Sequence, residues 1–261
     1  MYVLGISTGT DVAVDPLVDR LADRFADEGS VAVVRAGDVS TPDRTTYTVD
    51  GTTWTASGTG HGLDDVLDEL APDHDYALVV GFEEARVPHV AVGQDVDVEE
   101  PLRAALEPAA LDVEALVDAL HDTEPRETLA SLVAEAKRSP EAEYAGAIAT
   151  FTGRVRAKDE PDDARTTALS FEKYEGVADE RMTAIERELT ERDGVHEVVM
   201  HHRTGVVEYG EDIVFVVVLA GHRGEAFETV EDGINRLKDE VPLFKKEVTV
   251  EDEFWVHDRS E

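Results

Sequence analysis

The sequence contains no cysteine, and lysine is rare, with six lysines among 261 residues. The absence of cysteine excludes disulfides, thiolate metal ligands and cysteine nucleophiles. Long apolar runs are also absent, since none approaches the roughly 20 residues that a membrane-spanning helix needs. The first residues, MYVLGISTGTD, lack the basic start of a signal peptide. We therefore expect a soluble, cytoplasmic protein with no membrane partner.

Acidic residues dominate the composition. The chain has 59 aspartate and glutamate residues against 24 lysine and arginine residues, which gives a formal net charge of −35. Such a charge argues against a nucleic-acid partner and against binding to an anionic membrane. The composition resembles that of cytoplasmic proteins from salt-loving archaea. We therefore expect repulsion between surface charges to destabilise the fold at low salt.

The distribution of charge divides the chain into two parts. Residues 1–121 hold 25 acids, six arginines and no lysine, whereas residues 122–261 hold 34 acids and 18 basic residues. The change falls near the polar segment HDTEPRE (121–127), which contains Pro125. Because boundaries between domains fall in polar, proline-containing segments, we predict one domain of residues 1–121 and a second of residues 122–261.

Strand and helix patterns alternate in the first domain, which predicts an α/β fold with a mostly parallel sheet. The expected strands are 2–7, 31–36, 76–82 and 89–93, and the expected helices are 15–29, 62–70, 101–106 and 112–120. Residues 46–56 alternate around Asp50-Gly51, which is a strong signal for a β-hairpin.

The second domain has a different order of elements, which predicts an α+β fold. The expected helices are 127–138, a long helix that ends near residue 192, and 223–240. The expected strands are 146–156, 167–175, several strands within 195–222 that break at Gly205 and Gly210, and one or two strands within 244–256. The last helix is expected to present one apolar face, and Pro242 to end it. That face contains Ala226, Phe227, Val230, Ile234 and Leu237.

The segment GISTGTDV (5–12) follows a strand and precedes a helix, which is the position of a phosphate-binding loop. A working loop needs glycine, lysine and serine or threonine where this chain has Thr10, Asp11 and Val12. Because an acid would repel phosphate, we favour a turn of small residues over a nucleotide site.

The order of elements up to VVGFEEARVP (79–88) still resembles the MobB family of GTP-binding proteins associated with molybdenum cofactor assembly. In that family a Glu-Gly-Phe step ends a similar strand, whereas this chain has Val80-Gly81-Phe82. The resemblance covers roughly residues 1–120. We do not extend the nucleotide binding of that family to this chain, because the lysine and the hydroxyl of the phosphate-binding loop are missing.

Five basic clusters interrupt the acidic composition of the second domain: FTGRVR (151–156), HHRTG (201–205), GHR (221–223), LKDEVPLFKKE (237–247) and Arg259. Each alone has an ordinary explanation, such as a solvated strand or weak surface ion pairs. His201 and His202 would face opposite sides of a strand, so no metal site is expected. Together, cations retained on so acidic a chain suggest an anionic ligand. Arginine binds phosphate through a bidentate fork, and lysine can also act as acid, base or nucleophile.

In order and spacing these motifs resemble the MoaE family, the large catalytic subunit of molybdopterin synthase, over about residues 126–261. The resemblance implies a sulfurtransferase that converts cyclic pyranopterin monophosphate into molybdopterin by adding two dithiolene sulfurs. It also implies a small ubiquitin-like, MoaD-like partner whose C-terminal Gly-Gly carries the sulfur as a thiocarboxylate. The expected assembly is a homodimer within a heterotetramer, and no cofactor or metal is implied.

The resemblance assigns roles to individual residues. Lys238 matches the lysine most important for catalysis, and Lys245 matches the second essential lysine. Phe244 stands where the family usually has tryptophan. The residues that match substrate-binding positions are Phe151, Arg154, Val155, Arg156, His222, Arg223, Lys246, Glu247 and Arg259.

Helix and strand geometry limits how these residues can meet. If residues 223–240 form one helix, His222 and Lys238 lie about 24 Å apart at about 1.5 Å per residue. One chain could not place both on a phosphate-sized ligand, so we expect a homodimer with shared sites. Lys245 and Lys246 would face opposite sides of a strand.

Two other functions fit parts of the sequence. One is a non-enzymatic scaffold that binds the ubiquitin-like partner and the cofactor precursor, which would need no Lys238. The other is a nucleotide-dependent switch run by the first domain, against which Thr10 and Asp11 argue.

Overall fold

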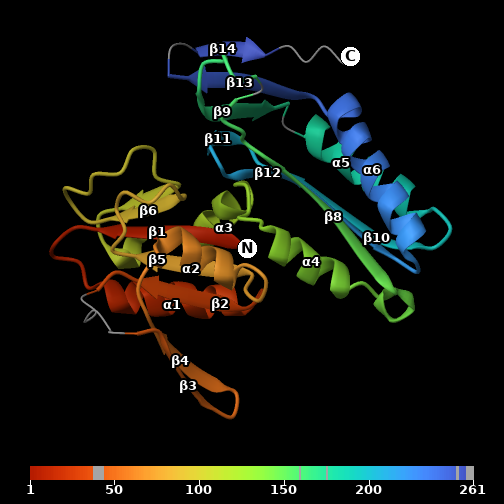
Figure 1. The fold of residues 1–261 in the computed structure, drawn as a ribbon. Coiled ribbons are helices and arrows are strands. Elements are labelled where there is room, and N and C mark those ends of the chain that lie inside the picture. The colour runs from red at the N-terminus through yellow and green to blue at the C-terminus, as the bar shows by residue number, and fades with distance from the viewer. Residues whose placement is uncertain (38–43, 159, 175, 251–252, 257–261) are drawn as a thin grey trace. The chain divides into compact units, whose positions relative to one another are not determined.

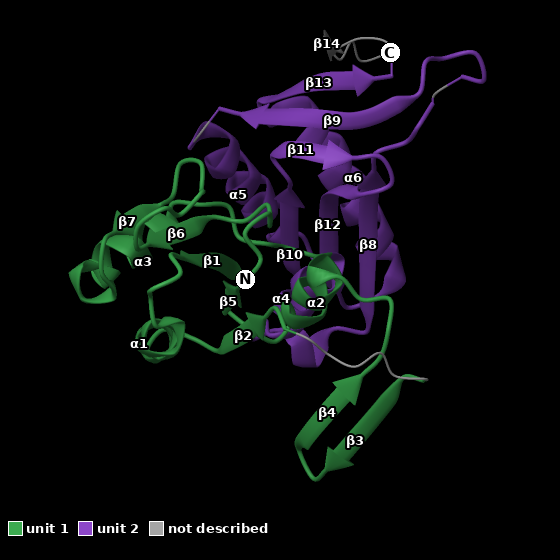
Figure 2. Ribbon diagram, turned by 90° about the vertical axis from the view of Figure 1, so that its left-hand side faces the viewer, with its two compact units in different colours: residues 1–128 green, residues 129–261 purple. Residues whose placement is uncertain are grey.

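The computed structural model describes residues 1–37, 44–158, 160–174, 176–250 and 253–256. The chain forms two compact units, Met1–Thr128 and Leu129–Glu261, which are coloured separately in Figure 2. Each unit has its own hydrophobic core. No helix of the described residues is long and apolar enough to cross a membrane.

The N-terminal unit is built on a five-stranded sheet whose strand order is β2-β5-β1-β6-β7. All four pairings in this sheet are parallel, which confirms the predicted α/β fold (Figure 1). The strands are β1 (Tyr2–Thr8), β2 (Val31–Arg35), β5 (Tyr76–Val80), β6 (His89–Val92) and β7 (Arg103–Ala105). The helices are α1 (Val14–Ala26), α2 (Leu63–Leu70) and α3 (Val113–His121), with a short 3-10 turn at Pro108–Ala110.

Helices cover both faces of this sheet, which is why its central strands β1 and β5 are apolar over most of their length. Leu4 and Leu78 face a core that also contains residues of α1 and α3, such as Leu21 and Leu116. Their neighbours in the strands face a second cluster that contains Leu67 of α2.

Residues 101–106 form no helix, so that prediction was wrong. Their central residues form β7, which pairs with β6 in parallel. The Leu102 N–H donates to the His89 carbonyl at 2.8 Å, and the Gly93 N–H donates to the Ala105 carbonyl at 2.9 Å. The segment is shorter than two helical turns, and the open edge of β6 offers its backbone these bonds. Tertiary pairing therefore outweighs the helix propensity of its leucine and alanines.

The predicted hairpin is confirmed as β3 (Thr46–Asp50) and β4 (Thr53–Ser57). Its turn is Gly51-Thr52, and Gly51 has a φ of 61°. Positive φ at the first turn residue is what a type II′ hairpin turn requires, and glycine adopts it without strain. The two strands form a sheet of their own.

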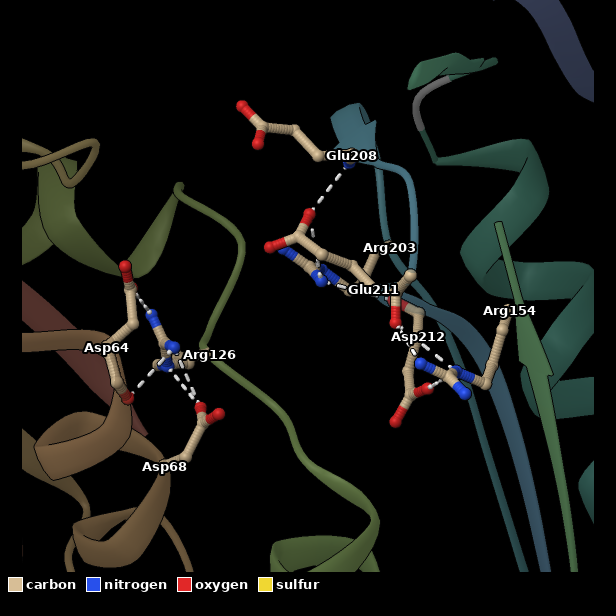
Figure 3. A network of polar contacts seen from close by, with 9 residues as sticks. Asp64, Asp68, Arg126, Arg154, Arg203, Glu208, Glu211 and Asp212 are labelled. Carbon is tan, nitrogen blue, oxygen red and sulfur yellow. Dashed lines mark hydrogen bonds and ion pairs between the residues drawn. The ribbon is translucent and has the colours of Figure 1, made fainter. Parts of the chain in front are cut away.

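The polar segment after α3, residues 122–128, contacts other parts of the N-terminal unit. Arg126 contacts two carboxylates of α2, with its Nη1 2.9 Å from Asp64 Oδ1 and its Nη2 2.7 Å from Asp68 Oδ1 (Figure 3). The Arg126 N–H also donates to the Met1 carbonyl at 2.8 Å. These bonds make residues 122–128 the last segment of the N-terminal unit.

The C-terminal unit has the predicted α+β fold, with one three-stranded and one four-stranded antiparallel sheet. The first sheet has the order β10-β12-β8 and the second β11-β9-β13-β14. The strands are β8 (Ala147–Arg154), β9 (Thr166–Lys173), β10 (Val195–His202), β11 (Gly205–Glu208), β12 (Asp212–Ala220), β13 (Leu243–Thr249) and β14 (Glu253–Val256). The helices are α4 (Leu129–Lys137), α5 (Val177–Thr190) and α6 (Arg223–Glu240), with a 3-10 turn at Ala142–Tyr144.

Both faces of the central strand β12 are buried, which explains its unbroken apolar run IVFVVVLA after Asp212. Val216 and Val218 face the larger core, which includes residues of α5 and α6. Phe215 and Val217 face a smaller cluster that includes Leu132 and Ala136 of α4.

The buried face of α6 differs at one residue from its prediction. Ala226, Ile234 and Leu237 are buried, but Phe227 is 63% exposed. A Cβ on the buried Gly233 would lie 3.1 Å from Val216 Cγ1, so the helix approaches the sheet closely at that glycine. Phe227 lies two turns before the buried Ile234 on the same side of the helix, so this side is exposed near the start of α6 and buried further along it.

Candidate functional site

The segment LKDEVPLFKKE places its lysines at the end of a helix and the start of a strand. Lys238 is exposed and lies in the last turn of α6. The Val241 N–H donates to the Leu237 carbonyl at 3.1 Å and closes the helix, and Pro242 separates it from β13. A cation in the last turn is favoured by the helix dipole.

The register of β13 separates the two remaining lysines of the segment. Lys245 is opposite Phe171 of β9, whose side chain belongs to the core of the unit. Lys246 is opposite Ser170. Because side chains alternate along a strand, Lys245 shares the core-facing side of the sheet with Phe171, and Lys246 lies on the other side. The predicted opposite orientation is thus what the strand shows.

One further lysine, which the sequence did not single out, lies on the same side as Lys245. Lys173 is two residues beyond Phe171 in β9, so it is a diagonal neighbour of Lys245 across the strand pair. Its Nζ lies 2.9 Å from Asp179 Oδ1 in the first turn of α5. Only the strand register could reveal this neighbour, because Lys173 is 72 positions before Lys245 in the sequence.

The segment FTGRVR lies at the end of β8. Phe151 is half-buried and packs against the core of the unit. Arg154 is exposed, donates to the Gly210 carbonyl, and its Nε lies 3.2 Å from Asp212 Oδ1 (Figure 3). The side chain of Val155 is only 2% exposed, so it can shape a site only through packing. Arg156, the next residue, is exposed.

His222 and Arg223 lie at the opposite end of α6 from Lys238. His222 caps the helix with extended backbone angles, φ −137° and ψ 163°, and Arg223 is the first helical residue. Both side chains are exposed. The positive end of the helix dipole and two basic side chains make this end suitable for an anion. The helix runs unbroken from residue 223 to 240, so one chain holds His222 and Lys238 about 24 Å apart.

Ion pairing distinguishes two sets of cations in the C-terminal unit. Several arginines outside the candidate positions contact carboxylates: Arg181, Arg192, Arg203 and Arg236. Within the described ranges, four candidate residues form no ion pair: His222, Arg223, Lys238 and Lys245. In a chain with 59 acids, unpaired cations are available for an anionic ligand.

The remaining candidates have individual surroundings. The Glu247 carboxylate accepts a hydrogen bond from the hydroxyl of the buried Thr166. His202 contacts the Phe171 ring edge-on at 4.7 Å, whereas His201 stacks on Phe215 at 6.4 Å. Since Phe171 and Phe215 belong to different clusters, the two histidines face opposite sides, as expected. Among the described residues no group of three or more His, Asp or Glu side chains could hold a metal ion. Arg259 lies outside the described residues.

Glu186 of α5 has a strongly perturbed carboxyl, and no sequence pattern singles it out. Burial raises its pKa to about 7, and the charges of Glu135 and Glu197 act in the same direction. The Met200 N–H donates to Glu186 Oε1 at 2.6 Å, which opposes the rise. Met200 belongs to β10, an edge strand of its sheet. The carboxyl therefore satisfies an edge N–H that β12 cannot reach.

The loop that resembles a phosphate-binding loop is packed against its own chain. The Gly9 N–H donates to the Val92 carbonyl at 2.9 Å, and a Cβ on Gly9 would lie 2.5 Å from the Gln94 carbonyl oxygen. The first turn of α1 carries Asp15, which pairs with Arg35 at 2.9 Å. These contacts engage the backbone of the loop with its own chain, which agrees with the argument from Thr10 and Asp11 against a nucleotide site.

Comparison with known proteins gave similarities in both parts of the chain. Residues 122–240 match the family described as MoaE protein. The chain is 59% identical over 206 residues to "Probable molybdopterin synthase" of Haloferax volcanii, which covers 79% of this chain and 78% of that protein. It is 40% identical over 114 residues to "Molybdopterin synthase catalytic subunit" of Yersinia pestis, covering 44% of this chain and 74% of that protein.

Two solved structures illustrate the structural similarities. A molybdopterin synthase from Staphylococcus aureus aligns with a TM-score of 0.45 at 29% identity, over 52% of this chain and 93% of that chain. A MobB protein homolog from Bacillus stearothermophilus aligns with a TM-score of 0.38 at 16% identity, over 47% of this chain and 100% of that chain.

Proposed function

This chain belongs to the MoaE family of molybdopterin synthases, and from that premise we propose that it is the catalytic subunit that makes the dithiolene of molybdopterin. The substrate is cyclic pyranopterin monophosphate. Each of two sulfurs comes from the C-terminal thiocarboxylate of a small ubiquitin-like carrier, which is left with an ordinary carboxylate. The site combines residues of α6, β8 and β13.

The observation that carries the proposal is that two lysines, Lys238 and Lys245, form no ion pair within the described residues. Lys238 lies in the last turn of α6, and Lys245 lies on the core-facing side of β13. Both the substrate phosphate and the thiocarboxylate are anions. Two uncommitted ammonium groups in an otherwise acidic chain provide the charge that such reactants need.

The side chains would divide the chemistry between them. Arg156, His222 and Arg223 hold the phosphate and the pterin. Lys238 acts as the acid–base group, or attacks covalently, while sulfur leaves the thiocarboxylate. Lys245 stabilises the negative charge that develops during transfer. Phe151, Val155 and the Thr166–Glu247 hydrogen bond shape and support the site.

The length of α6 supports a site that is shared between two subunits. Because about 24 Å separates His222 from Lys238 in one chain, a phosphate-sized ligand can contact both only if they come from two chains. We therefore assign His222 and Arg223 of one protomer to the site that contains Lys238 of the other. Two such protomers and two carriers make the heterotetramer.

Direct reconstitution tests this function. The protein, cyclic pyranopterin monophosphate and a thiocarboxylated carrier are combined in molar salt, and molybdopterin is measured. The wild-type chain should form it, and Lys238→Ala should abolish turnover while substrate still binds. Lys137→Ala is a matched control, because it removes an ammonium group from the end of α4, outside the proposed site.

A scaffold that binds carrier and precursor without catalysis is the alternative. It predicts that the wild-type chain binds carrier and precursor but forms no molybdopterin in this mixture, and that Lys238→Ala leaves binding unchanged. The N-terminal unit has no assigned chemistry in either case, and we propose that it acts as an interaction module.

A further inference from the structure

Lys173 is a cation of the C-terminal unit to which the proposed reaction assigns no role. It lies opposite Leu243 in the pairing of β9 with β13, and Lys245 is two residues further along β13. The two lysines are therefore diagonal neighbours on one side of the sheet, and the Cα atoms of such neighbours lie roughly 7–8 Å apart. Two long side chains at this spacing can both contact one carboxylate-sized group.

An ion pair gives independent evidence for the side of the sheet on which Lys173 lies. Its Nζ lies 2.9 Å from Asp179 Oδ1, in the first turn of α5. Ala178 and Met182 of the same helix belong to the core that Phe171 faces. The helix that pairs with Lys173 thus covers the core-facing side of β9, which agrees with the strand register.

The backbone also joins this place to the lysine segment LKDEVPLFKKE (237–247). The N–H of Tyr174 donates to the carbonyl of Pro242 at 3.4 Å, at the turn between α6 and β13. Lys173 therefore lies beside the turn that separates the two lysines of the proposed site. Three of the six lysines of the chain gather here, although the net charge is −35. Such a concentration favours an anionic ligand.

The ion pair leaves Lys173 able to bind a second anion. A lysine ammonium has three donors, and Asp179 accepts from one of them. The side chain of Lys173 is 23% exposed and that of Asp179 is 51% exposed, so solutes can reach the pair. The dipole of α5 stabilises the carboxylate in its first turn, which fixes the position of the ammonium.

Its position indicates which anionic group of the reactants Lys173 meets. In the proposed function, residues of β8 and of the start of α6 hold the phosphate. Lys238 and Lys245 act on the thiocarboxylate, and Lys173 is the diagonal neighbour of Lys245. A carboxylate or thiocarboxylate has two acceptor atoms, so two neighbouring ammonium groups can each bind one of them.

We propose that Lys173 binds the C-terminal carboxylate or thiocarboxylate of the carrier beside Lys245, and that Asp179 holds its ammonium in place. This role rests on the proposed function and adds a third lysine to the same site. Lys173 positions the tail of the carrier and takes no part in breaking or forming a bond.

Binding without turnover tests the proposal. The probe is a ubiquitin-like carrier that ends in Gly-Gly, prepared with a C-terminal carboxylate and with an uncharged C-terminal amide. In molar salt the screening length is about 3 Å, so a difference in affinity between the two forms reports direct contacts with the charge. Wild type should prefer the carboxylate form. Lys173→Met should lower this preference by roughly tenfold, which corresponds to one lost charge-assisted hydrogen bond.

Three further variants separate a direct contact from other effects. Lys137→Met removes the same charge from the end of α4 and should keep the wild-type preference. Lys173→Arg keeps a cation and should keep most of the preference. Asp179→Asn removes the ion pair but leaves the charge of Lys173, so it should keep the preference as well. Circular dichroism identifies any variant that fails to fold, and Lys173→Gln then replaces Lys173→Met.

Turnover gives a second measurement. Lys173→Met should raise the KM for the thiocarboxylated carrier, whereas the KM for the cyclic precursor and kcat should stay near their wild-type values. This pattern is expected when a variant loses binding that the ground state and the transition state share.

Three results would overturn the proposal. The first is an unchanged preference for the carboxylate form in folded Lys173→Met. The second is an equal loss of preference in Asp179→Asn, which would mean that the ion pair only supports the fold. The third is a wild-type chain that binds both forms equally. A wild-type chain that binds neither form would refute the proposed function together with this role.

Discussion

Mixed dimers give the sharpest test of the shared site. His222→Ala and Lys238→Ala each remove one group from opposite ends of α6, about 24 Å apart. Each homodimer should be inactive, because both of its sites lack a group. A mixed dimer has one site that lacks both groups and one site that is intact.

The expected activity follows from counting sites. Random assortment of equal amounts makes about half of the dimers mixed, and each has one working site of two, so activity should recover to about one quarter of wild type. Dimers purified through two different tags should reach about one half. Molybdopterin formation with carrier and precursor in excess is the assay.

A matched mixture controls for nonspecific recovery. In the proposed assembly, Lys238 and Lys245 of one chain contribute to the same site, so Lys238→Ala mixed with Lys245→Ala leaves no intact site and should stay inactive. If purified His222→Ala/Lys238→Ala dimers are no more active than their parents, the reasoning from helix length is refuted.

Three further predictions concern stability. Glu186→Gln should raise the free energy of unfolding at pH 8 by about 1–3 kcal/mol, because the native carboxyl has a pKa of about 7 against an ordinary value of 4.5. The protonated carboxyl of Glu186 contributes to the free energy of unfolding in full below pH 4.5, and this contribution is lost as the pH rises through 7. Wild-type and variant curves of unfolding free energy against pH that stay parallel in constant salt would contradict this prediction. Gly153→Ala should cost about 1–3 kcal/mol in denaturant titration, because its Cβ would lie 2.6 Å from Val214 Cγ1, whereas Gly224→Ala, which meets nothing within 4 Å, should not destabilise. Dialysis from molar salt into dilute buffer should lower the melting temperature, followed by circular dichroism, because the net charge of −35 is then poorly screened; an unchanged melting temperature would argue against repulsion.

Local patterns predicted most elements of this fold because the patterns had few alternatives. The helix 223–240 has a regular apolar stripe and a following proline, and α6 has those bounds. The prediction of a helix at residues 101–106 was wrong because this short segment pairs with the edge of β6, and no local pattern records such a pairing. The prediction that Phe227 is buried was wrong because its side of α6 is buried only further along the helix, at Ile234, and no local pattern records how far the packing partners of a helix extend.

The candidate site shows the same limit. The resemblance to the MoaE family assigned Lys238 and Lys245 to the site, and the alternation of side chains along a strand predicted that Lys246 faces the side opposite Lys245. The sequence could not identify Lys173, because a diagonal neighbour across β9 and β13 depends on strand register. Nor could it predict the raised pKa of Glu186, which arises from burial between elements distant in sequence.

The central claim is that Lys238 makes the chemistry possible, and one measurement tests it most directly. Molybdopterin is quantified after a single turnover of wild type and of Lys238→Ala with thiocarboxylated carrier, alongside the affinity of each for the cyclic precursor. We predict product with wild type, none above background with Lys238→Ala, and similar affinity for the precursor. Product formation by Lys238→Ala at a rate near that of wild type would contradict the account.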